Sequence, residues 1–114
     1  MTQNNTSDKV EVTKIYYKSG ALYWEVPRVN GKKHGIEKWY YESGALMVET
    51  PYVDGKEHGI KKWYYESGAL RIETPYVDGK KHGIHKAYNT DSVNINGLRL
   101  YKKGHRTAII NSNI

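Results

Sequence analysis

Hydrophobic and polar residues alternate along most of this chain, and the pattern repeats every 24 residues. Residues 40–63 form the clearest copy, YYESGALMVETPYVDGKEHGIKKW, and residues 16–39 and 64–87 repeat it on either side without a gap. Alternation with a period of two predicts β-strands whose side chains point to the two faces of a sheet in turn. A fixed repeat of this length predicts an array of similar units.

Two different turn signals divide each copy into two strands. The first is Asn-Gly or Asp-Gly, which favours a two-residue type I′ turn and occurs at residues 30–31, 54–55 and 78–79. The second is Lys-Ser-Gly or Glu-Ser-Gly at residues 18–20, 42–44 and 66–68, which favours a three-residue loop with a left-handed glycine. We therefore predict an all-β fold, a single-layer antiparallel meander of stacked hairpins with about nine strands in a twisted, open sheet.

The tight turn also predicts which residues face each other. With Asp54-Gly55 as the loop, Val48 faces Lys61, Leu46 faces Trp63, and Glu49 lies diagonal to Lys62. One face then carries Leu46, Val48, Thr50, Tyr52, Gly59, Trp63 and Tyr65. The other carries Met47, Glu49, Pro51, Val53, His58, Ile60, Lys62 and Tyr64. We expect the first face to be the more apolar, with Gly59 leaving room for a neighbouring ring.

We expect one repeat domain between two tails. Residues 9–110 form the domain, with a capping strand at 9–17, full repeats at 16–39, 40–63 and 64–87, and a degenerate C-terminal repeat at 88–110. Residues 101–109 match residues 76–84 with an offset of 25, and Asn96-Gly97 indicates a bulge or a very short hairpin. Residues 1–8 are polar and predict a disordered tail, and residues 111–114 form the other tail.

The repeated residues resemble a known family. The pattern Y-Y-E-S-G-A-L followed by Y-V-D-G-K-x-H-G-I-x-K-W-Y-Y is similar to the MORN-repeat variant family, and more loosely to MORN repeats with their N-G-K-x-H-G core. The resemblance spans Tyr16 to about Tyr88 and occurs three times. It implies stacked hairpins twisted into an open groove and a non-catalytic binding or scaffolding role. Bacterial members are often labelled antitoxin-like, and some MORN proteins have been linked to membrane phospholipids. Ala87 replaces the tryptophan found at Trp63, which suggests that the array ends there.

Composition narrows the function classes. The 114 residues carry a net charge of +6, are 38% hydrophobic, and include no Phe or Cys but 11 Tyr and 3 Trp. This balance argues against a thick two-layer core and suits a sheet that is wet on at least one face. The absence of Cys fits a reducing compartment, and no apolar run reaches the length of a membrane span. The N-terminus lacks the regions of a secretory signal, so we expect a cytoplasmic protein, or one peripheral at a membrane.

Two sets of residues are candidates for partner binding. Tyr and Trp dominate binding hot spots. The more apolar face, which we call the aromatic face, carries Trp24, Trp39, Tyr41, Tyr52, Trp63, Tyr65 and Tyr76. The alternative is that neighbouring hairpins bury these rings against one another. Cations follow each tight turn and predict a Lys/His rim for an anionic partner: Lys32, Lys33, His34, Lys56, His58, Lys80, Lys81, His82, Lys102, Lys103 and Arg106. The alternative is that these charges serve solubility.

Other chemistry has little support. His34, His58 and His82 stand two strand spacings apart, about 10 Å, which is too far for neighbouring copies to share a metal ion. We find no arrangement of nucleophile and base, so we expect neither an enzyme nor a cofactor. Our hypothesis is a protein-binding or scaffold module that captures a partner on the aromatic face, with an antitoxin-like role as one form. The alternative is docking on anionic phospholipid through the rim; nucleic acid is disfavoured, and a homodimer stays open.

Overall fold

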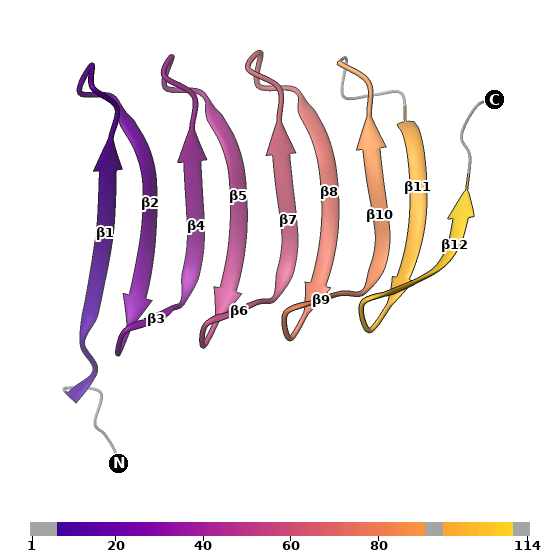
Figure 1. The fold of residues 1–114 in the computed structure, drawn as a ribbon, viewed down its shortest axis with the longest axis horizontal. Helices are drawn as coiled ribbons and strands as arrows, with labels where there is room; N and C mark the ends of the chain where they lie inside the picture. The colour runs from indigo at the N-terminus through magenta and orange to yellow at the C-terminus, as the bar shows by residue number, and fades with distance from the viewer. Residues whose placement is uncertain (1–6, 91–94, 111–114) are drawn as a thin grey trace.

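The computed structural model describes residues 7–90 and 95–110, which form one antiparallel sheet (Figure 1). The order β1-β2-β4-β5-β7-β8-β10-β11-β12 follows the chain, so each strand pairs with the next along this path. These nine strands are Val10–Tyr16, Leu22–Val29, Gly35–Tyr40, Leu46–Val53, Gly59–Tyr64, Leu70–Val77, Gly83–Tyr88, Ile95–Lys102 and His105–Ile110. The two-residue strands β3 (Lys32–Lys33), β6 (Lys56–Glu57) and β9 (Lys80–Lys81) pair with β2, β5 and β8. The predicted meander is confirmed.

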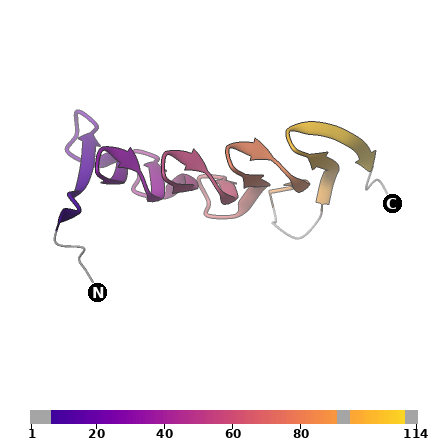
Figure 2. The same ribbon diagram turned by 90° about the horizontal axis from the view of Figure 1, so that it is seen from below.

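The sheet is a single layer, and the described residues place no second sheet or helix against it (Figure 2). None of them forms a helix long and apolar enough to cross a membrane. Residues 1–6 and 111–114 of the expected tails, and residues 91–94 at the start of the degenerate repeat, lie outside the described ranges.

The two kinds of turn lie along opposite edges of the sheet, with the tight turns at the lower edge in Figure 1. Asn30, Asp54 and Asp78 have φ angles of 52°, 48° and 49°, as type I′ turns require, and Lys103 (φ 51°) starts the same turn in the last hairpin. In the wide turns, the amide of Gly44 donates to the carbonyl of Tyr41 at 2.9 Å. Both turn predictions are therefore confirmed, including the left-handed glycine of the wide turn (Gly44, φ 96°).

A bulge after each tight turn changes the predicted register. Next to the turn Val53 pairs with Lys56, but further along β5 Val48 pairs with Trp63 and Glu49 with Lys62. The predicted pairs of Val48 with Lys61 and Leu46 with Trp63 are wrong, and Glu49 lies directly opposite Lys62 instead of diagonal to it. The extra residues are His58 and Gly59, and the His58 amide donates to the carbonyl of Pro51 at 3.0 Å. Because the shift is two residues, the side chains keep their faces.

A second bulge lies beside each wide turn. Trp39 pairs with Val48 and Tyr40 with Leu46, so Met47 is the unpaired residue between them. Met47 consequently lines a hollow together with Trp39 and Trp63, and its predicted place on the opposite face is wrong. Leu46 pairs with Tyr40 and so lies on the face opposite to that of Trp39, which makes its predicted place beside Val48 wrong as well. We call the side of the sheet that holds the hollow the Trp face (Trp24, Trp39 and Trp63) and the other the proline face (Pro27, Pro51 and Pro75).

The buried residues belong to the Trp face. They are Val26, Thr50, Val48, Thr74 and Glu37, which are 0%, 2%, 4%, 4% and 5% exposed. Because the sheet is a single layer, only side chains on the same face can cover these residues, and the large Tyr and Trp rings of the Trp face do so. The Trp face is therefore the side on which the sheet builds its core.

The bulge after each tight turn requires glycine, a residue without a Cβ atom. Gly59 has a φ of 117°, and a Cβ there would lie 2.9 Å from the Cγ atom of Pro51. The ring beside this glycine is thus the proline of its own hairpin, whereas the sequence suggested a ring from a neighbouring hairpin.

We predict that Gly59→Ala destabilises the protein by about 1–3 kcal/mol, through backbone strain alone, with the clash against Pro51 adding to it. Urea unfolding would measure the change. Gly97→Ala is the matched control, because Gly97 has no positive φ and nothing within 4 Å of the added Cβ. The control should change stability by less than about 1 kcal/mol. Equal effects of the two substitutions would contradict the bulge explanation.

Candidate functional site

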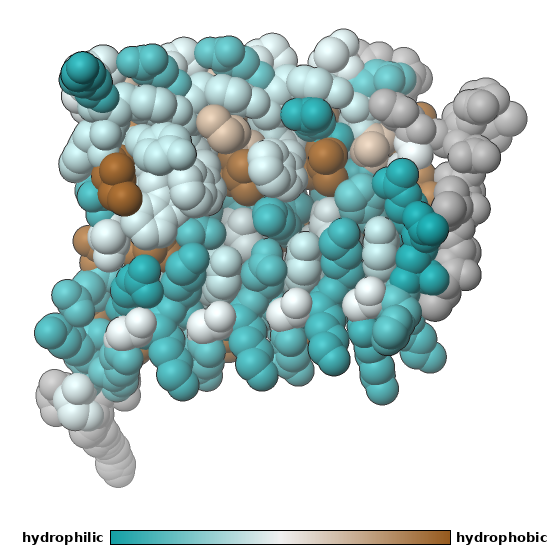
Figure 3. Space-filling model, in the orientation of Figure 1, coloured by the Kyte–Doolittle hydropathy of each residue, from teal (hydrophilic) through white to brown (hydrophobic). Residues whose placement is uncertain are grey.

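The aromatic residues singled out in the sequence lie on or beside the Trp face, and all are partly exposed. Trp24 and Trp39 contact each other, with ring centroids 5.6 Å apart and planes tilted by 44°. Tyr41 and Tyr65 lie in the wide turns, where the Tyr41 hydroxyl donates to the carbonyl of Tyr64 at 2.7 Å. In Figure 3 pale and brown residues gather in the half of this face toward the wide turns, below a margin that includes teal residues, and the half near the tight turns is mostly teal.

Two further aromatic residues of this cluster, Tyr17 and Tyr23, were not predicted from the sequence. The Tyr23 ring lies 5.2 Å from that of Trp39 in an edge-on contact, and 4.8 Å from that of Tyr17. Tyr23 occupies the bulge position that Met47 has in the next repeat, so strict alternation assigned it to the wrong face. The three-residue loop could have predicted the face of Tyr23, because such loops are commonly followed by a β-bulge.

A hollow opens on the Trp face between the two central tryptophans. We call it the central hollow; its lining residues are Glu37, Trp39, Met47, Val48, Thr50, Lys61 and Trp63. Val48 and Thr50 are buried and form its floor, whereas the tryptophans form its walls. The hollow is therefore an aromatic cleft with one acidic and one basic residue at its margin.

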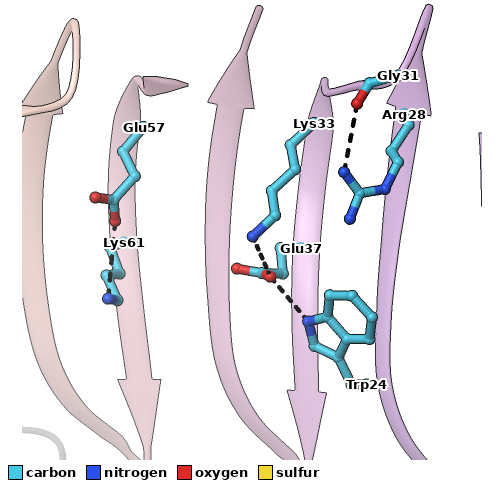
Figure 4. A network of polar contacts seen from close by, with 7 residues as sticks. All are labelled: Trp24, Arg28, Gly31, Lys33, Glu37, Glu57 and Lys61. Carbon is cyan, nitrogen blue, oxygen red and sulfur yellow. Dashed lines mark hydrogen bonds and ion pairs between the residues drawn. The ribbon is translucent and has the colours of Figure 1, made fainter. Parts of the chain in front are cut away.

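A buried carboxylate organises the polar contacts of the first repeat (Figure 4). Glu37 Oε2 accepts hydrogen bonds from Trp24 Nε1 at 2.8 Å and from Lys33 Nζ at 2.9 Å. Burial opposes the charge of Lys33, but the hydrogen bond and charge of Glu37 outweigh it, so the pKa of Lys33 is raised. In the next repeat the charges are exchanged, and Lys61 Nζ lies 3.8 Å from Glu57 Oε2.

The third repeat has two basic residues at these positions. His85 replaces Lys61, and its Nδ1 lies 2.8 Å from Thr74 Oγ1. Burial, followed by the nearby charges of Lys81 and Arg99, lowers the pKa of His85. The site that holds an ion pair in the first two copies therefore holds a hydrogen bond between His85 and Thr74 in the third.

The Lys/His rim divides between the two faces. Lys33 and Lys81 turn onto the Trp face, where their Nζ atoms lie 4.9 Å from the ring centroids of Tyr52 and Tyr101. By contrast, Lys32, Lys56 and Lys80 each lie beside the turn glycine of the next repeat. Lys56, Lys80, His82 and Lys103 surround a shallow hollow with Val77 and Asp78, while Lys102 and Arg106 are exposed near the last turn.

The three rim histidines link successive tight turns. His34 Nδ1 accepts a hydrogen bond from the backbone amide of Asp54 at 3.2 Å, and His58 and His82 repeat the contact with Asp78 and Lys103. In the described ranges no three His, Asp or Glu side chains gather as they would around a metal ion. The repetition of His is thus explained by the stacking of the turns.

The proline face carries an apolar row that was not predicted from the sequence. Val12, Ile36, Ile60 and Ile84 are 55%, 46%, 48% and 43% exposed, and the first three lie opposite Pro27, Pro51 and Pro75. The isoleucine of each H-G-I sequence was the available signal. Its exposure was not evident, because burial cannot be derived from an alternating pattern alone.

Beside this row, glutamates and lysines alternate from strand to strand on the proline face. Glu49 lies opposite Lys38 on one side and Lys62 on the other, and it accepts a hydrogen bond from the Tyr64 hydroxyl at 2.8 Å. Tyr40 and Tyr88 make the same contact with the preceding glutamates at 2.6 Å. Burial first, and then the bonded carboxylate, raises the pKa of Tyr40 and Tyr64 to about 12. For Tyr88 the hydrogen bond is the larger cause, and its pKa is also raised to about 12.

We predict that the protein loses stability as the pH rises above about 10. The three tyrosines have a higher pKa when folded than the ordinary value of 10.0, so the stabilisation is complete below pH 10 and lost as the pH approaches 12. Each pair contributes on the order of 1 kcal/mol after allowance for solvent screening. Between pH 9 and 12, the free energy of unfolding of Tyr64→Phe should depend less on pH than that of the unaltered protein. Tyr16→Phe, at a residue that is 57% exposed, should show the same pH dependence as the unaltered protein. Identical slopes for both variants would contradict the role of the Tyr–Glu pairs.

A family comparison agrees with this architecture. The family model described as MORN repeat variant matches residues 33–54 and 57–78, which run from the end of the first full repeat into the third. No curated protein and no solved structure matches the chain significantly. MORN repeats are in general modules that bind proteins or membranes and are not typically enzymes. The match supports MORN-type repeats over these residues, which is compatible with a non-enzymatic scaffold.

Proposed function

We propose that this chain is a non-enzymatic module that captures a partner protein on its Trp face. The observation that carries the proposal is the partly exposed aromatic cluster, which no other described part of the sheet covers. Tyr and Trp offer large contact areas at low cost in conformational entropy and dominate the energetics of many interfaces. The central hollow adds a concave point at the middle of this surface.

Charge favours an acidic partner. The chain carries a net charge of +6, and Lys33, Lys61 and Lys81 reach onto the Trp face. Such cations steer the approach of an acidic surface and fix its orientation more than they add to affinity. The aromatic residues would supply the affinity and the rim would orient the partner.

The biological role of capture takes one of two forms in this proposal. The chain serves as a scaffold, or it neutralises a toxin or effector by covering a functional surface. The second form rests on the family resemblance. A cytoplasmic location and a homodimer also remain predictions. Light scattering of the purified protein would measure its oligomeric state.

We predict that Trp63→Ala abolishes capture without unfolding the sheet, because the third repeat has Ala87 at the equivalent position. Tagged protein would be incubated with native lysate at low and high salt, and retained proteins would be identified by mass spectrometry. Ile60→Thr is the matched control, since Ile60 lies on the same strand but on the proline face. A stoichiometric partner kept at high salt, lost with Trp63→Ala and retained with Ile60→Thr supports the proposal. Loss with the control alone would assign binding to the proline face.

The second candidate is docking on anionic phospholipid. It is favoured by the shallow basic hollow of Lys56, Lys80, His82 and Lys103 at the tight-turn edge. Vesicles containing phosphatidylserine should then bind at low salt, release the protein at high salt, and fail to bind the triple variant Lys32→Glu, Lys56→Glu, Lys80→Glu. Binding that persists in this variant would exclude the rim as the lipid site.

A further inference from the structure

We propose that the central hollow is a binding site for an aromatic side chain that has a carboxylate beside it. This inference rests on the proposed function, because the natural occupant would be an anchor residue of the captured protein. It goes further in naming the chemistry of that residue and the place on the described part of the array that receives it.

The first repeat shows what packs into such a space. Tyr23 and Trp24 precede Met47 and Val48 by 24 residues, and their rings lie 5.2 and 5.6 Å from the ring of Trp39. The chain therefore fills the first of these spaces with its own aromatic side chains. Trp39 forms a wall of both spaces, with its own neighbours on one side and the central hollow on the other.

The second repeat leaves the equivalent space open. Met47 and Val48 are smaller than the Tyr and Trp of the first repeat, and Val48 is 4% exposed at the floor. The result is a gap between Trp39 and Trp63, two walls on which an aromatic ring can stack. An aromatic ring is the group that the neighbouring repeat already accommodates.

The third repeat cannot provide the same site. Ala87 stands where the second tryptophan wall would be, and it pairs with Ile72 across the strands. Arg71 occupies the position of Met47, and its guanidinium carbon lies 5.6 Å from the centroid of the Tyr65 ring. An array of similar units thus contains one hollow with two aromatic walls in its described part.

The charge at the margin selects the second feature of the occupant. In the first repeat, Glu37 accepts the indole N–H of Trp24. Lys61 replaces Glu37 in the second repeat, with its Nζ 5.5 Å from the Trp63 ring centroid. Its ion-pair partner, Glu57, is 3.8 Å away, which is a long contact for an ion pair. Glu37 also lines the hollow, but its Oε2 already accepts hydrogen bonds from Trp24 and Lys33. The ammonium group of Lys61 complements an acceptor, so the occupant should carry a carboxylate where Trp24 carries a donor.

The test uses N-acetylphenylalanine as the probe and N-acetylphenylalaninamide as its uncharged counterpart. Titration of the full chain would be followed by NMR through the three indole N–H signals. We expect saturable shifts at Trp39 and Trp63, smaller shifts at Trp24, and at least threefold weaker binding of the amide. Equal affinity of the two probes, or shifts spread over the whole sheet, would overturn the proposal.

Two variants and a control locate the site. Val48→Trp copies the first repeat into the central hollow and should weaken binding of the acid at least tenfold. Ile72→Trp makes the same change one repeat later and should leave the affinity within twofold. Lys61→Gln, whose amide keeps the polar margin, should keep the shifts at the tryptophans and abolish the preference for the acid. Undiminished binding to Val48→Trp, or an unchanged preference in Lys61→Gln, would refute the assignment.

The outcomes separate this inference from the proposed function. If the probe binds as described but no partner is captured from lysate, the hollow stands and the proposed function fails. If a partner is captured through Trp63 but the probe shifts neither Trp39 nor Trp63, capture stands and the hollow is not its anchor site. Displacement of a captured partner by excess acid, and not by the amide, would support both.

Discussion

The contact between one repeat and the next supports everything else in this sheet, because the described residues form a single layer. At the wide-turn edge, the hydroxyl of Tyr17 donates to the carbonyl of Tyr40, and the bond recurs in the following repeats. At the tight-turn edge, His34 accepts the amide of Asp54 in the same recurring manner. Each hairpin is thus fixed at both ends to its neighbour, and side-by-side packing on the Trp face can then bury Val26 and Val48 without a second layer.

Comparison of the copies shows which polar contacts the backbone requires. Lys33 and Glu37 form an ion pair of 2.9 Å, and Glu57 and Lys61 reverse the charges at 3.8 Å with the same register of strands. Neither polarity is therefore needed to form the sheet. What differs is burial, since the side chain of Glu37 is 7% exposed and that of Glu57 is 24% exposed. The pair in the first repeat is the tighter one because Trp24 covers it and shares its carboxylate.

Much of the fold could be predicted because the turns carry local signals. Asp54-Gly55 needs positive φ at both residues, and the strand order of a meander follows once every turn is placed. The bulges were missed, since a two-residue shift at His58–Gly59 leaves the alternation intact and Met47 breaks it at one position. For the site, alternation placed the tryptophans on one face. The greater apolarity of this face was expected as well, but alternation could not reveal that Ile60 on the other face is 48% exposed, because exposure depends on what covers each face.

The differences between copies, more than their shared residues, localise recognition on this surface. Identical repeats would present the same aromatic space about every 10 Å along the stack, and a partner could then bind in several registers. Trp24 fills the first space and Ala87 removes a wall of the third, so the two central tryptophans stand alone among the described repeats as a pair with room between them. An array whose ends are altered in this way would hold one partner in one register.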